Sequence, residues 1–198
     1  MTDGPDGDSQ GDDLVAVLLQ QHGQIRRLCG AIVNAPDVRS RSFSQLQALL
    51  TAHEASEHAI VRQMTLETAG QSTIGDREAE ERAIRAALLD VSRLPTASAE
   101  FEVRFTHLAN LVRAHLDSEE REEFPHLLAH YDAEERRVLG ARFVAAGVLA
   151  PARPAAILSR PTAARSVLRP LAALLQRTRD VRASGTRHGD EGATGGTR

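Results

Sequence analysis

His53-Glu54-Ala55-Ser56-Glu57 is the stretch that decides the fold, and its spacing returns in His115-Leu116-Asp117-Ser118-Glu119. Both segments place a histidine four residues before a glutamate. Positions four residues apart lie on the same face of an α-helix, about one turn from each other. Each segment can therefore direct an imidazole and a carboxylate toward one point. Two such pairs facing each other inside a bundle of helices would form a site for two metal ions.

Hydrophobic residues recur every three or four positions around both segments, which predicts helices with one buried face. In the segment that begins near Arg41 or Ser42, the buried positions are Phe43, Leu46, Leu50, His53, Glu57, Ile60 and Met64. In the segment that follows Ser98, they are Phe101, Phe105, Leu108, Val112, His115, Glu119 and Glu122. The histidines and glutamates thus stand where leucine would be expected.

Two other predicted helices also carry a polar residue on the buried face, His22 in the first and Glu81 in the third. The positions His22, His53, Glu81 and His115 lie 31, 28 and 34 residues apart. Such similar intervals bring the middles of four helices to one level when the helices run up and down with short connections. The sequence therefore predicts an all-α fold, an antiparallel up-down-up-down four-helix bundle with an additional C-terminal helical segment.

A layer of imidazoles and carboxylates inside such a bundle requires compensation. Burying an ionised group without a partner costs about several kcal/mol. A bound cation removes that cost, and neutral imidazole with carboxylate suits iron, manganese or zinc. The other interpretation is a hydrogen-bonded polar layer without a metal. Because several histidines and glutamates are expected at the same level of the bundle, the metal site is the favoured interpretation.

Three motifs of this chain resemble those of the hemerythrin-like HHE cation-binding family. They are LLQQHGQIR at residues 18–26, HEASEH at residues 53–58, and HLDSEEREEFP at residues 115–125. The last motif, H-x-x-x-E-E-x-x-x-F-P, is the most specific of the three. The resemblance covers roughly residues 12–130 and implies a four-helix bundle that holds a non-haem di-iron centre.

The resemblance also implies which residues bind the metal. The ligands would be His22, His53 and Glu57 for one iron and His115 and Glu119 for the other, with the carboxylates bridging. Some members of the family also use the glutamate next to the histidine of the second helix, which makes Glu54 a secondary candidate.

The third predicted helix departs from the family pattern. The family motif resembles E-E-H, whereas this chain has Glu80-Glu81-Arg82. Arginine cannot bind a metal, because its guanidinium is a cation without a free lone pair. Glu81, or Glu78 one turn earlier, could take the place of the missing histidine. The cofactor would then be two iron ions, or a single iron ion if the residues at the second position do not bind one.

Composition and motifs divide the chain into five parts. The predicted parts are a disordered N-terminus at 1–11, the bundle at 12–130, a short accessory helix at 131–149, a Pro/Arg-rich linker and possible helix at 150–183, and a disordered tail at 184–198. Cys29 is the only cysteine, which excludes an internal disulfide. No signal peptide and no apolar run of about 20 residues is present, so the sequence predicts a cytoplasmic protein without a membrane span.

The predicted function is to bind or sense O2, NO, peroxide or iron at the metal centre. One alternative is an enzyme that decomposes peroxide, and another is a partner-binding bundle whose metal site has degenerated; the sequence leaves it open whether the protein is an enzyme. The small ligand would be a diatomic molecule or peroxide. The acidic excess of residues 1–150 argues against nucleic acid, whereas the arginine-rich segment 151–198 could contact a protein partner.

Overall fold

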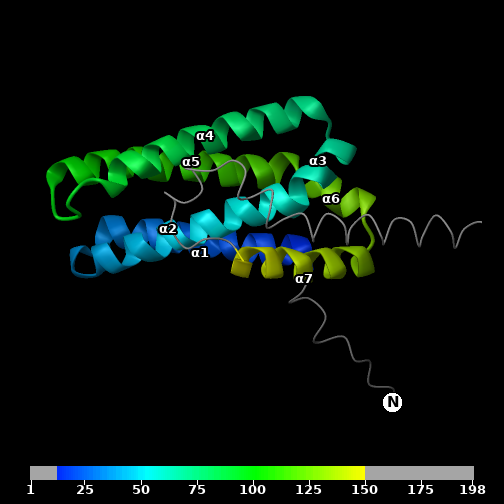
Figure 1. The fold of residues 1–198 in the computed structure, drawn as a ribbon, viewed down its shortest axis with the longest axis horizontal. Helices are drawn as coiled ribbons and strands as arrows, with labels where there is room; N and C mark the ends of the chain where they lie inside the picture. The colour runs from blue at the N-terminus through cyan, green and yellow to red at the C-terminus, as the bar shows by residue number, and fades with distance from the viewer. Residues whose placement is uncertain (1–12, 150–198) are drawn as a thin grey trace, which may run out of the picture. The chain divides into compact units, whose positions relative to one another are not determined.

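The computed structural model describes residues 13–149, which form a bundle of long helices (Figure 1). The elements are α1 (Leu14–Asn34), η1 (Pro36–Val38), α2 (Arg39–Ser56), η2 (Glu57–Val61), α3 (Arg62–Thr68), α4 (Gln71–Ser92), α5 (Ala99–Glu122), α6 (Phe124–His130) and α7 (Ala133–Leu149). This part of the chain has no strand, and the predicted all-α bundle with an additional C-terminal helix is confirmed. The predictions for 1–11, 150–183 and 184–198 lie outside the described residues.

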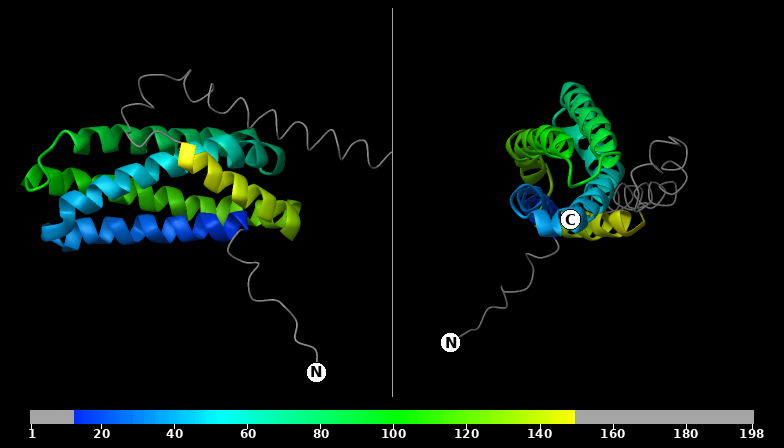
Figure 2. Two further views of the ribbon diagram at one scale, coloured as in Figure 1. Left: turned by 60° about the horizontal axis from the view of Figure 1, so that its bottom comes forward. Right: turned by 90° about the vertical axis from the view of Figure 1, so that its left-hand side faces the viewer.

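Four rods make the bundle, and the end-on view in Figure 2 shows them around a common axis. They are α1, the continuous rod of α2, η2 and α3, then α4, and finally α5. α1 packs against α2 and α5, and α4 packs against α5 and α3. The short α6 turns the chain at the end of α5, and α7 then runs back along α1 and α2.

Local sequence signals place the ends of the rods. The Asp13 side chain accepts a hydrogen bond from the Val15 amide at 2.9 Å, and the Ser98 side chain accepts one from the Phe101 amide at 3.1 Å. These are N-terminal caps, which satisfy amides that have no partner within the helix. Gly70 turns the chain between α3 and α4 with a φ of 88°, a conformation that favours glycine.

The core is apolar throughout one half of the bundle, whereas the other half combines apolar side chains with buried polar ones. The apolar half lies toward the connections α1–α2 and α4–α5, and its fully buried side chains include Ile25, Ile32, Leu46, Ile84, Phe101, Phe105, Leu108 and Leu116. The rings of Phe43, Phe101 and Phe105 pack edge-on or stacked, with centroids 5.2–6.1 Å apart. This half stabilises the fold and leaves the opposite half of the interior for polar side chains.

The second rod contains one irregular turn. Residues Glu57–Val61 form a turn of π-helix, and the Arg62 amide donates to the Glu57 carbonyl, five residues back. A π turn inserts one extra residue, so every later side chain is rotated relative to a regular helix. The sequence pattern did not predict this turn, because the buried positions before and after it still recur every three or four residues.

None of the described helices combines the length and the apolar content that a bilayer crossing requires.

The apolar half of the core should carry most of the folding free energy. Leu108 is fully buried in α5, and Leu108→Ala should lower the free energy of unfolding by about 2–5 kcal/mol through the cavity it leaves. Val103→Ala on the same helix is the control, because Val103 is 71% exposed and should change stability by less than about 0.5 kcal/mol. The free energy of unfolding of both variants is measured with urea in the absence of metal. If both variants lose the same amount, the proposed division of the core is contradicted.

Candidate metal centre

Five of the predicted ligands lie together in the polar half of the bundle. His22 comes from α1, His53 from α2, Glu57 from η2, and His115 and Glu119 from α5. Each exposes 5% or less of its surface. One ligand-type atom from each of His22, His53, Glu57 and Glu119 lies within 4.8 Å of the others. The structure thus brings together residues that are up to 97 positions apart in the sequence.

The two carboxylates connect the three imidazoles. The Nε2 atom of His53 lies 3.2 Å from Oε1 of Glu57. Glu119 extends one oxygen to each of the other two histidines, with Oε2 3.4 Å from Nε2 of His22 and Oε1 3.1 Å from Nε2 of His115. Glu119 therefore lies between the two imidazoles, in the position of a bridging group.

The Nε2 atoms of His22, His53 and His115 are buried, and none has a hydrogen-bond partner in the part of the chain that the structure describes. The same holds for one oxygen each of Glu57 and Glu119. An unsatisfied buried polar atom costs about 1–3 kcal/mol. Such atoms gathered in one buried region fit a cation, because imidazole nitrogens and carboxylate oxygens are ligands that divalent metal ions take.

The other ring nitrogen of each imidazole is held in place by an oxygen acceptor. Nδ1 of His22 lies 2.8 Å from Oε1 of Glu120. Nδ1 of His53 lies 2.9 Å from Oε1 of Gln21, and Nδ1 of His115 lies 2.9 Å from Oε2 of Glu80. Because an acceptor requires the hydrogen on Nδ1, the lone pair of Nε2 faces the centre in all three rings. This arrangement orients imidazoles that bind metals.

Sequence reasoning missed these three acceptors. Gln21, Glu80 and Glu120 each stand directly beside a buried-face residue. The adjacency to His22, Glu81 and Glu119 is the only signal they offer. It does not say which neighbouring helix a side chain reaches.

Burial makes the two carboxylates unequal. It raises the pKa of Glu57 well above the usual range, and the neighbouring charge of Glu119 raises it further. Burial also opposes ionisation of Glu119, but the contact with His22 and the nearby His115 prevail and lower its pKa. The pKa of Glu57 is therefore raised while that of Glu119 is lowered, although both carboxyls are buried. Burial lowers the pKa of His53 to about 3, so this imidazole is neutral and available as a ligand.

Glu81 and Glu54, the other predicted ligands, lie outside the group of four. Glu81 is buried and forms an ion pair with Arg62, and its second oxygen lies 3.6 Å from Arg85. Glu54 lies 3.3 Å from the same Arg85, and burial raises the pKa of Glu54 to about 7. Both side chains already have cationic partners, and their roles as ligands stay predictions.

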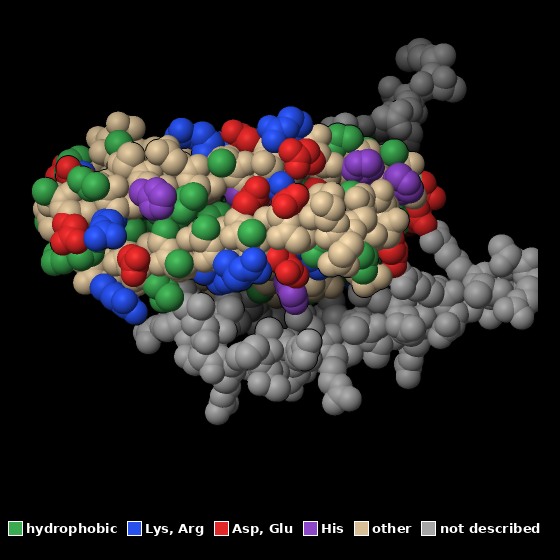
Figure 3. Space-filling model, turned by 90° about the horizontal axis from the view of Figure 1, so that it is seen from above, with side chains coloured by type: hydrophobic (Ala, Val, Ile, Leu, Met, Phe, Trp, Pro, Cys, Tyr) green, Lys and Arg blue, Asp and Glu red, His purple; other side chains and the backbone are tan. Residues whose placement is uncertain are grey.

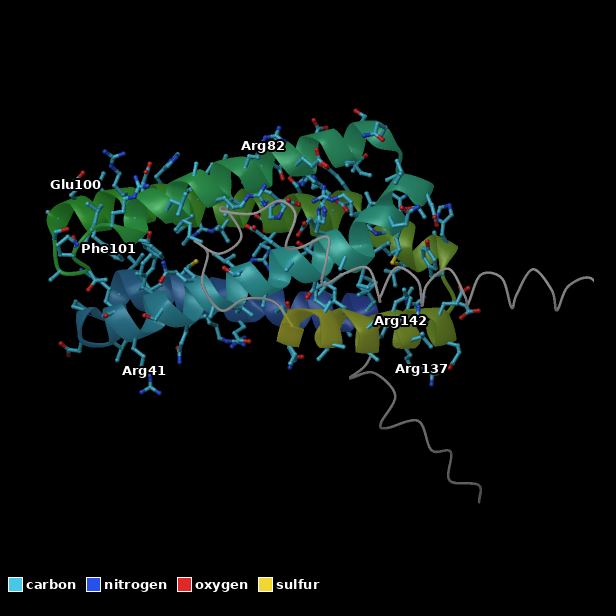
Figure 4. All side chains as sticks on the ribbon, viewed as in Figure 1. Arg41, Arg82, Glu100, Phe101, Arg137 and Arg142 are labelled. Carbon is cyan, nitrogen blue, oxygen red and sulfur yellow. The ribbon has the colours of Figure 1, made fainter. Side chains whose placement is uncertain are left out.

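Arg82, which replaces the family histidine, lies on the outer side of α4 (Figure 4). Its side chain is 64% exposed and pairs only loosely with the exposed Glu78, at 3.9 Å. Figure 3 shows the face on the α4 side, where acidic and basic side chains are interspersed. Neither Arg82 nor Glu78 takes part in the buried centre.

Aromatic side chains of the last two helices cover the centre. The ring of Phe124 in α6 lies 5.4 Å from the ring of His22, and the ring of Phe143 in α7 lies 6.1 Å from that of His53. Phe143 is fully buried. The helix predicted as an accessory element therefore helps to exclude water from the centre.

Orientation of His53 by Gln21 should strengthen metal binding. Gln21→Ala removes the Nδ1 acceptor, and loss of such a partner lowers metal affinity by about 10–100-fold. Gln20→Ala is the matched control, because Gln20 is the preceding residue and is exposed. Affinities measured by competition with a chelating dye should differ between the variants. Equal affinities would contradict the orienting role.

Metal binding should release a proton from Glu57. Burial raises the pKa of this carboxyl and so favours its protonated form, whereas an ion needs it ionised. Affinity should therefore rise with pH until Glu57 is ionised without the metal, and fall at lower pH. A titration in weakly buffered solution with a pH indicator should show that metal binding releases protons. Binding that releases no proton and does not depend on pH would contradict this assignment.

Comparisons with known proteins agree with this geometry. The sequence model of the hemerythrin HHE cation-binding domain matches residues 13–127. A search of curated proteins gave no match. A crystal structure of a hemerythrin HHE cation-binding domain-containing protein from Mycobacterium kansasii is similar in fold, with a TM-score of 0.63 and 24% identity over 79% of this chain and 96% of that chain. The family match spans more than half of this chain, and the chain therefore belongs to the hemerythrin HHE cation-binding domain family.

Proposed function

We propose that this cation-binding protein holds iron at His22, His53, Glu57, His115 and Glu119 and presents it to O2, NO or peroxide. The proposal depends on one observation: ligand atoms of the buried His22, His53, Glu57 and Glu119 lie within 4.8 Å of one another, and His115 contacts the same Glu119 at 3.1 Å. The chain belongs to a cation-binding family, and this supports the proposal that a metal ion binds here.

Iron suits this donor set better than its main competitor, zinc. Zinc sites usually have four ligands and often include thiolate. The centre offers five imidazole and carboxylate residues, and the only cysteine, Cys29, lies in the apolar core cluster instead. Burial raises the pKa of Cys29 to about 11, which keeps it a neutral thiol. A reducing compartment such as the cytoplasm would suit both this thiol and ferrous iron, and we propose that location.

The chain's residues would shape how a small ligand reaches the ion. A ferrous ion with an open coordination position binds O2, NO or peroxide directly. The imidazoles are held in a single orientation by Glu120, Gln21 and Glu80, so they need no rearrangement to bind. Phe124 and Phe143 cover the site with apolar surface. Such a covered site admits a molecule of two or four atoms more readily than a large substrate.

Removal of the buried histidines tests the site. His53→Ala and His115→Ala should each lose most of the bound iron, because each removes one of three imidazole ligands. His58→Ala and His107→Ala are matched controls, since both histidines are exposed on the same two rods and should leave the iron content unchanged. Elemental analysis of the purified variants measures their iron content, and circular dichroism verifies that they are folded.

Three outcomes separate the candidate functions. A reversible change in the visible absorption of the ferrous protein on adding O2 or NO supports a binding or sensing role. Sustained O2 evolution from peroxide, lost in His115→Ala, would make the protein an enzyme. A wild-type protein that folds without metal, and does not change when its histidines are replaced, would contradict the proposal and favour a partner-binding bundle.

A further inference from the structure

We propose that the guanidinium groups of Arg62 and Arg77 take the place of a second metal ion, so that the centre binds one ion per chain. This inference rests on the proposed function, because it concerns how many ions the same site holds.

A second ion would need His115 and Glu119 together with Glu81, the carboxylate of α4 that replaces the missing histidine. Beyond Glu57 and Glu119 is a cavity of only about 10 Å³, which is also lined by Glu81 and Glu123. Arg62 and Arg77 complete its polar lining. A cavity of this size accommodates about one water molecule. The carboxylates that could bind an ion there therefore already face two permanent cations.

Arg62 reaches this cavity because of the π turn in the second rod. The extra residue places Arg62 where a regular helix would have position 61, four residues after Glu57 and on the same face. Its guanidinium forms an ion pair with Glu81, the carboxylate that the sequence suggested as a ligand for the second ion. Binding of Glu81 to a metal would require this ion pair to break.

Arg77 approaches the cavity from α4 and is almost completely buried. Its Nε lies 3.5 Å from Oε1 of Glu123, and its two terminal nitrogens lie 2.9 Å from Glu80 and 3.1 Å from Glu122. Glu80 is also the acceptor for Nδ1 of His115. Arg77 therefore belongs to the same network as the imidazoles, and a buried guanidinium is a cation that cannot lose its proton.

The charges also balance with a single ion. In ionised form, the four carboxylates around the cavity and the two guanidinium groups leave an excess of two negative charges. One divalent cation held by His22, His53, Glu57 and Glu119 neutralises this excess. The third rod offers no replacement, because α4 contains no histidine.

The number of ions per chain tests the inference directly. Iron-loaded wild-type protein, freed of excess metal, should contain one iron by elemental analysis. After oxidation, an isolated high-spin ferric ion has half-integer spin and gives an electron paramagnetic resonance signal, whereas two coupled ferric ions cancel their spins and give none. Two irons without a signal would overturn this inference and leave the proposed function standing. No iron would contradict both.

Replacing Arg62 and Arg77 tests whether their charges exclude the second ion. Arg62→Gln combined with Arg77→Gln keeps polar side chains of reduced length but removes both charges, and should raise the capacity from one iron to two. Arg82→Gln is the control, because Arg82 is an exposed arginine on α4, and it should still bind one. A folded double variant that keeps one iron would show that the arginines do not exclude the second ion. If the double variant does not fold, the wild-type ratio and spectrum still decide.

Discussion

The burial of ionisable groups in the middle of a helical bundle is the constraint on which the rest of this structure depends. Three imidazoles and several carboxylates occupy positions that a simple bundle would fill with leucine. Ionised groups placed there without compensation would destabilise the fold by several kcal/mol each, by order of magnitude. The surroundings of the centre can be understood as the means by which the chain avoids that cost.

Compensation takes three forms in different parts of the centre. Oxygen acceptors from Gln21, Glu80 and Glu120 satisfy one nitrogen of each imidazole. Guanidinium groups of Arg62 and Arg77 lie among the carboxylates on the side of α3 and α4. What remains is a set of buried nitrogen and oxygen atoms without a hydrogen-bond partner among residues 13–149, and a cation suits them. The first two forms come from the protein, and the third requires the metal that the family binds.

The fold tolerates these buried polar groups because another part of its core is purely apolar. Tightly packed leucine, isoleucine and phenylalanine side chains fill one half of the bundle and hold the four rods in register. Because that half supplies hydrophobic stabilisation, the other half can carry polar groups whose arrangement serves binding. The π turn is a local example, since it departs from regular helix geometry where Glu57 faces the centre and where Arg62 must reach Glu81.

The sequence by itself determined the rods and the faces from which the ligands come. Helical periodicity placed His22, His53, Glu57, His115 and Glu119 on buried faces, and the similar intervals between rods placed them at one level, because both quantities depend only on positions along the chain. Only the tertiary structure decided the partners: that Gln21 reaches His53, that Arg62 pairs with Glu81, and that Phe143 packs near His53. These contacts join side chains of different rods. They depend on how the helices are rotated against each other and on one inserted residue at the π turn, and neither leaves a mark in the spacing of the sequence.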